Sequence, residues 1–144
     1  MIRALALLLL LATVPAWAAP VPKELKRNDD ARNILGTWQM VHHSMGGGPP
    51  TPQSVKWRLE PDGKATILNL NEIAVTYKLH PGTSPKGFDW NWPTSSYPGL
   101  YELDGDTLKV VILQQNGTAR PTKLEPGPKV IYCEFKRLAP EGKK

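Results

Sequence analysis

The stretch from Gly99 to Leu113 constrains the fold more than any other part of this chain. Two runs rich in β-forming residues flank the pair Asp104-Gly105, and Asp-Gly suits the positive-φ positions of a tight hairpin turn. In the second run Leu108, Val110 and Ile112 alternate with a mixed set of side chains, so one face of that strand is wholly apolar. The segment is therefore predicted to be a β-hairpin with one buried face.

The same pattern recurs along the chain. Pro61-Asp62-Gly63 is a second turn signal, and the run before it alternates Val55, Trp57 and Leu59 with charged residues. Six further strands are expected from such alternation, at residues 37–44, 55–60, 64–70, 73–80, 87–92 and 129–138. Gly- and Pro-rich stretches at 46–52 and 114–128 are predicted to be long loops, the second with room for a short strand at 122–124.

Eight strands in sequence, mostly joined by tight turns, indicate a meander that closes on itself. Closure pairs the edge strands that an open sheet of this size would leave free. We therefore predict an all-β fold, an eight-stranded antiparallel up-and-down barrel over residues 34–138. A two-sheet sandwich remains the alternative, because alternation shows which side chains share a face and not which strands pair.

Both ends of the chain are predicted to lie outside the barrel. Residues 1–18 have the basic start, the apolar run and the small residues near the cleavage point of a secretory signal peptide. The run is shorter than the ~20 residues that span a bilayer, which disfavours the alternative of an uncleaved anchor. Residues 19–33 are expected to hold a short helix at 23–33 or a frayed arm, and residues 139–144 a disordered tail. Export to the periplasm or the extracellular space is expected.

The sequence Leu35-Gly36-Thr37-Trp38 resembles the start of the first strand in lipocalin-like barrels. The resemblance implies that Gly36 and Trp38 close one end of the barrel and that Arg137, in the last strand, stacks on the indole. An arginine over an indole contributes roughly 0.5 to 2 kcal/mol. This part of the resemblance concerns barrel closure and implies a structural role.

A closer resemblance is to a family of uncharacterised, mostly exported bacterial lipocalin-like domains best known from planctomycetes. Four motifs carry it: Leu35-Gly36-Thr37-Trp38, which corresponds to the family's Leu-x-Gly-Thr-Trp, Pro-Lys-Gly-Phe-Asp at 85–89, the Gly-x-Tyr-x-x-Asp-Gly-Asp-x-Leu stretch at 99–108, and Arg120-Pro121. Because the family has no established activity, the resemblance implies a fold and export and leaves the function open.

The histidines and the cysteine do not indicate an enzyme, a metal centre or a cofactor. His42 and His43 are neighbours in an expected strand, so they point to opposite faces, His42 on the face of Trp38 and Met40. Cys133 is the chain's one cysteine, and its place in an apolar run predicts a core residue and not a nucleophile. No catalytic motif with a serine or histidine nucleophile or base is present.

The sequence does not indicate nucleic acid, calcium or a membrane as a partner. The formal net charge of +5 is spread along the chain, without the basic blocks and interleaved aromatics that bind nucleic acid. Asp104 and Asp106 bracket Gly105, but calcium needs six or more oxygen ligands, so turn chemistry explains them better. After the leader nothing resembles a membrane span, and no stable membrane insertion is expected.

Aromatic residues on the expected inner faces provide the one indication of a binding function. An eight-stranded barrel is just wide enough either to be filled by side chains or to hold one small molecule. We expect a non-enzymatic protein that binds a small apolar or amphipathic ligand, and the residues expected to line the site are Trp57, Phe88, Trp90, Tyr101 and Tyr77. The alternative is a filled barrel that binds a cell-envelope protein through the loops at 46–52 and 93–98.

Overall fold

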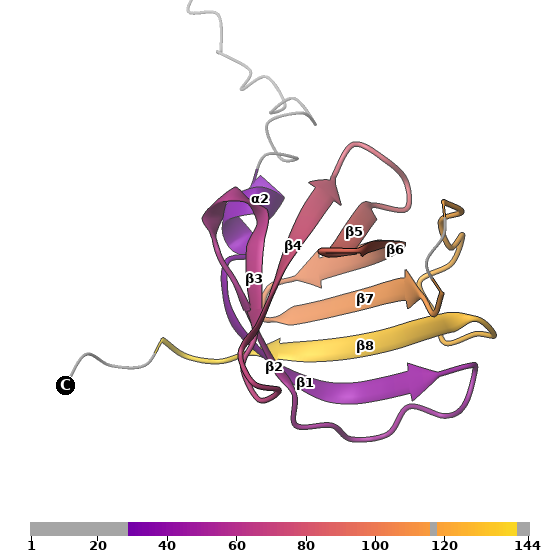
Figure 1. Ribbon diagram of the computed structural model, residues 1–144, viewed down its shortest axis with the longest axis horizontal. Coiled ribbons are helices and arrows are strands. Elements are labelled where there is room, and N and C mark those ends of the chain that lie inside the picture. Colours follow the sequence, from indigo (N-terminus) through magenta and orange to yellow (C-terminus); the bar gives the residue numbers. More distant parts are fainter. Residues whose placement is uncertain (1–28, 116–117, 141–144) are drawn as a thin grey trace, which may run out of the picture.

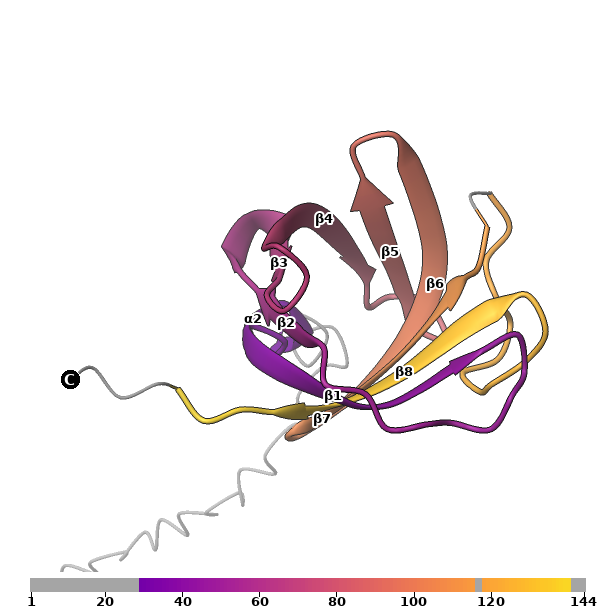
Figure 2. The ribbon, with the colours of Figure 1, turned by 60° about the horizontal axis from the view of Figure 1, so that its bottom comes forward.

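The computed structural model describes residues 29–115 and 118–140, which form a closed barrel of eight antiparallel strands in sequence order (Figures 1 and 2). Each strand pairs with its neighbours along the chain, and the last pairs with the first. The strands are β1 (Gly36–Met45), β2 (Lys56–Leu59), β3 (Lys64–Ile67), β4 (Ile73–His80), β5 (Gly87–Trp92), β6 (Ser95–Asp104), β7 (Thr107–Leu113) and β8 (Val130–Arg137). The predicted up-and-down barrel is confirmed, and the architecture is compatible with a lipocalin-like fold.

One short α-helix, α2 (Asp29–Asn33), precedes the barrel within the described part of the chain. It covers the last five residues of the helix predicted for residues 23–33. The predicted signal peptide at 1–18 and most of the segment 19–33 lie outside the described residues, as do residues 141–144 of the predicted tail.

The two Asp-Gly signals both form strand-joining turns. Asp62 and Gly63, in the 3₁₀ turn η1 (Pro61–Gly63), have φ values of 64° and 72°, a conformation that Asp and Gly tolerate well. At the β6–β7 turn Gly105 alone takes a positive φ, of 55°, while Asp104 is the last residue of β6.

Two predicted strand boundaries and one predicted short strand were wrong. β3 ends at Ile67 and not at residue 70, because the chain already turns toward Asn71 and Glu72, whose φ values are 54° and 49°. β6 begins at Ser95, so the predicted contact loop at 93–98 is mostly strand paired with β5. No strand forms at 122–124, although these residues are described.

A bulge in β1 overturns the predicted faces of that strand. Met40 pairs with Phe135 and His42 with Glu134, so Val41 is an extra residue on β1. An extra residue reverses the alternation beyond it. His42 therefore leaves the face of Trp38 and Met40, and His43 takes its place.

The segment 46–52, predicted to be a long loop, is partly fixed to β1. Thr51 forms a two-hydrogen-bond bridge with His43, with N···O distances of 2.7 and 2.8 Å. β2 pairs with β1 only at residues 36–39, so it leaves the same edge of β1 open farther along. The connection runs back along this part of the edge, below the barrel in Figure 1.

Candidate functional site

One end of the barrel is closed by a plug built on Trp38 and Arg137. The Arg137 guanidinium lies 4.2 Å from the centre of the Trp38 ring, and the indole Nε1 donates a hydrogen bond of 2.8 Å to the carbonyl oxygen of Ile34. Trp38 is fully buried. Gly36 leaves the room that Arg137 needs, because a Cβ at this position would lie 3.2 Å from its Nη1. This is the arrangement that the lipocalin-like resemblance implies.

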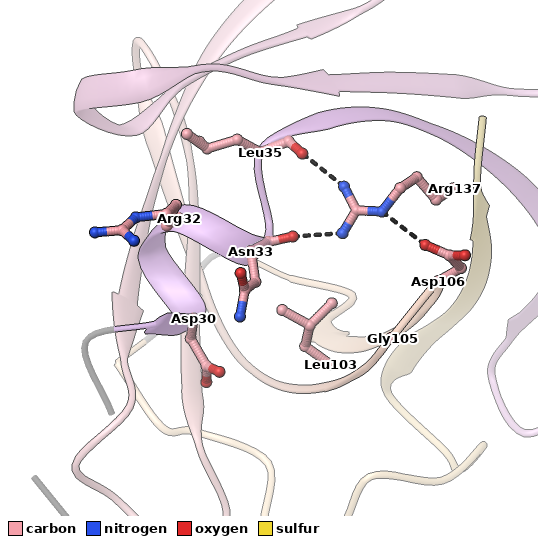
Figure 3. A pocket seen from close by; sticks show the side chains of 8 residues that line it. All are labelled: Asp30, Arg32, Asn33, Leu35, Leu103, Gly105, Asp106 and Arg137. Atoms are coloured by element: carbon pink, nitrogen blue, oxygen red, sulfur yellow. Dashed lines mark hydrogen bonds and ion pairs between the residues drawn. The ribbon is translucent and has the colours of Figure 1, made fainter. Parts of the chain in front are cut away.

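Arg137 ties the plug to two chain segments, residues 33–35 and the β6–β7 turn (Figure 3). Nη1 donates to the carbonyl oxygen of Leu35 at 2.7 Å, Nη2 donates to that of Asn33, and Nε donates to Oδ1 of Asp106 at 3.0 Å. A hollow of about 430 Å³ lies beside these groups. Because the donors of Arg137 already have partners within the chain, we assign this hollow to barrel closure and not to ligand binding.

A second polar link joins α2 to the barrel wall. Oδ2 of Asp30 accepts hydrogen bonds from the Tyr101 hydroxyl at 2.7 Å and from Lys86 Nζ at 2.6 Å. Burial and then the neighbouring carboxylate raise the pKa of Tyr101 far above its ordinary value. The phenol is therefore a fixed donor that holds α2 over the closed end.

Stacked aromatic rings fill the middle of the barrel. Phe88 lies 6.0 Å from Tyr77, 5.8 Å from Trp90 and 6.3 Å from Tyr101, measured between ring centres. Trp90 in turn stacks on Trp57 at 4.2 Å with the two planes 16° apart. Ring pairs that stack or tilt at such distances stabilise a core beyond simple burial, and Phe88 and Tyr101 are fully buried in this part of the interior.

The other end of the barrel is open and holds a cavity of about 520 Å³. It lies between the strand ends farthest from the plug, and its floor is the Trp57–Trp90 pair. Its lining is predominantly apolar and consists of Met40, His43, Met45, Gln53, Val55, Trp57, Ile67, Leu70, Trp90, Trp92, Tyr97, Ile112, Gln114, Ile131 and Cys133. Small-molecule sites typically have volumes of roughly 300–1,000 Å³, so this cavity has the size and polarity of such a site.

The five aromatic residues predicted to line a ligand site divide between two places. Trp57 and Trp90 line the cavity, whereas Phe88, Tyr77 and Tyr101 do not and belong to the packed middle of the barrel. The two hydroxyls explain part of this division, because Tyr101 binds Asp30 and Tyr77 donates to the carbonyl oxygen of Glu60 at 3.0 Å. The barrel is thus filled at one end and open at the other.

Several cavity residues were missed by the sequence analysis. Met40, His43 and Met45 line the cavity from β1, and Cys133 faces them from β8. The bulge that turns His43 inward has no local sequence signal. Burial raises the pKa of the Cys133 thiol to about 12, so the free protein holds it as a neutral thiol.

A polar cluster on the outer wall was also missed. Arg120, from the β7–β8 connection, lies 2.7 Å from Oδ1 of Asp89 and donates to the carbonyl oxygen of Gly99 at 2.6 Å, while His80 Nε2 lies 2.6 Å from Oδ2 of Asp89. Partial burial acts to raise the pKa of Asp89, but hydrogen bonds and charge from His80 and Arg120 outweigh it and hold that pKa below its ordinary value. The cluster fastens the long connection to β5 and β6.

The residues that the structure describes contain no group of three His, Cys, Asp or Glu side chains able to hold a metal ion. Among the same residues, no helix has the length and apolar character needed to cross a membrane.

The chain was also compared with known proteins. No protein-family model, no curated protein and no solved structure matches it. The geometry of the barrel and its cavity therefore carries the functional argument alone.

Proposed function

We propose that this is an exported, non-enzymatic protein that binds one small apolar or amphipathic molecule in the open end of its barrel. The observation that carries the proposal is the cavity of about 520 Å³ with an indole pair as its floor. Removing apolar ligand surface from water against such walls is the main driving force for binding at sites of this kind.

The distribution of exposed apolar side chains supports the same site. Among the described residues, Met45 and Leu70 are the large hydrophobic side chains that are about half exposed, at 51% and 50%, and both line the cavity. Exposed apolar surface concentrated at one place marks a binding surface more often than scattered single residues do.

The polar groups of the lining favour an uncharged or amphipathic ligand. The described lining residues include no Asp, Glu, Lys or Arg. A ligand charge buried there would have no partner and would cost several kcal/mol. Gln53, Gln114 and His43 can instead offer hydrogen bonds to a neutral polar group of the ligand.

Titration with the uncharged fluorescent probe N-phenyl-1-naphthylamine tests the proposal. We expect saturable binding of one probe per chain to the full-length protein. Val55→Trp adds bulk to the cavity lining and should abolish it, while Lys56→Trp places the same bulk at the neighbouring β2 residue, which does not line the cavity, and should leave it intact. Equal probe binding by the two variants would contradict the proposed site.

A further inference from the structure

Four side chains that carry sulfur or nitrogen line the β1–β8 wall of the cavity. His43 is the direct cross-strand partner of Cys133, while Met40 and Met45 pair with the residues two positions to either side, Phe135 and Ile131. Cβ atoms of directly opposed residues lie roughly 4.5–5.5 Å apart, and diagonal neighbours at roughly 7–8 Å are within reach of long side chains. All four side chains line the same cavity.

The bulge at Val41 creates this arrangement. Regular alternation would turn Met40, His42 and Ser44 inward and leave His43 and Met45 on the outside. With the extra residue, the row facing Cys133 becomes Met40, His43 and Met45. Bulges commonly re-aim side chains beside functional sites.

The backbone of this wall is held on both sides. His43 pairs with β8 on one edge and with Thr51 on the other. No hydrogen bond or ion pair of the His43 imidazole occurs within the described residues. His43 is one of the residues that line the cavity, and an imidazole nitrogen can act as a metal ligand.

The chemistry of these donors selects the class of ligand. Thioether and thiol sulfur are soft ligands that favour cuprous copper, and an imidazole nitrogen is compatible with it. We propose that Met40, His43, Met45 and Cys133 form a binding site for a soft monovalent cation, Cu(I), on this wall of the cavity.

Charge balance favours the binding of Cu(I) over that of divalent ions. Cys133 is the one described lining residue whose ionised form would be an anion close to the imidazole, and a thiolate with Cu(I) makes a neutral pair. A divalent ion would leave a positive charge without a partner in an apolar cavity. On binding, the S–H bond of Cys133 breaks, the S–Cu bond forms and the proton leaves to solvent, so neither sulfur nor copper changes oxidation state.

The test is a titration of the full chain with Cu(I) under anaerobic, reducing conditions, in competition with a chromogenic Cu(I) chelator. We expect one bound ion per chain and a loss of affinity of at least roughly 10- to 100-fold in Cys133→Ala and in His43→Ala. His42→Ala is the matched control, because the neighbouring histidine lies on the other side of the wall, and its affinity should equal that of the wild type.

X-ray absorption at the copper edge gives a reading that does not depend on whether the buried cysteine variant folds. Sulfur and nitrogen neighbours around the copper of the wild-type protein support the site. Absence of bound Cu(I), purely nitrogen and oxygen neighbours, or equal affinities in His43→Ala and His42→Ala would each overturn it. The naphthylamine titration is a separate measurement, so either proposal can fail without the other.

Discussion

Arg137→Ala should destabilise the barrel more than any other single loss of a charged side chain described above. The substitution removes the cation over Trp38 and the donors to the Leu35 and Asn33 carbonyl oxygens. It also removes the contact with Asp106, whose side chain is 82% exposed.

The magnitude follows from these contacts. The stacking contributes about 1 kcal/mol and each hydrogen bond to a carbonyl oxygen about 1 kcal/mol, at the low end for a charged donor because Arg137 is 25% exposed. The exposed pair with Asp106 adds less than about 0.5 kcal/mol. The expected loss is about 3 kcal/mol, or roughly 10–20 °C in Tm for a domain of this size.

Urea denaturation of the variant and the wild type measures this loss. Arg137→Lys keeps the charge but not the planar fork, so about half of the loss should remain. Lys123→Ala is the control, since Lys123 is 76% exposed and pairs with Glu125, which is 62% exposed, and the free energy of unfolding of this variant should change little. A loss below about 1 kcal/mol in Arg137→Ala would refute the idea that this residue locks the closed end.

Two further predictions concern the wall and the turns. Asp89→Asn should cost about 1–2 kcal/mol at neutral pH, because Arg120 and His80 both lose their carboxylate partner. As the folded-state pKa of Asp89 is below the ordinary 3.8, the difference from wild type is complete above that value and closes as the pH falls through the folded-state pKa. A difference in urea midpoints that does not vary with pH would contradict this. Gly63→Ala should cost more than Gly105→Ala in thermal melts. Both glycines have positive φ, which costs about 1–2 kcal/mol for alanine, but only at Gly63 would the Cβ meet an oxygen, that of Tyr77, at 2.5 Å. Equal losses would count against that clash.

The barrel could be predicted from the sequence because its determinants are local. Asp-Gly pairs set the turns at 62–63 and 104–105, and strict alternation marks strands such as β2 and β7. With eight strands in this order, few arrangements bury the apolar face of every strand. Pairing of β1 with β8 is expected for a related reason, because it leaves no edge strand unpaired.

The candidate site could be predicted only in part, because it depends on register and depth. Alternation identifies Trp57 and Phe88 alike as inward-facing, but only their positions along the barrel place the first at the cavity and the second in the packed middle. The bulge at Val41 is fixed by pairing with a strand about ninety residues later, so no local pattern could reveal that His43 faces inward. Contacts of Arg120 with Asp89 likewise arise only once the chain is closed.

Native mass spectrometry of the protein purified from its natural source tests the central claim most directly. The account predicts a complex of one small organic molecule with one chain, retained in Lys56→Trp and lost in Val55→Trp. A single mass corresponding to the chain alone, or the same bound molecule in both variants, would contradict binding in the open end of the barrel.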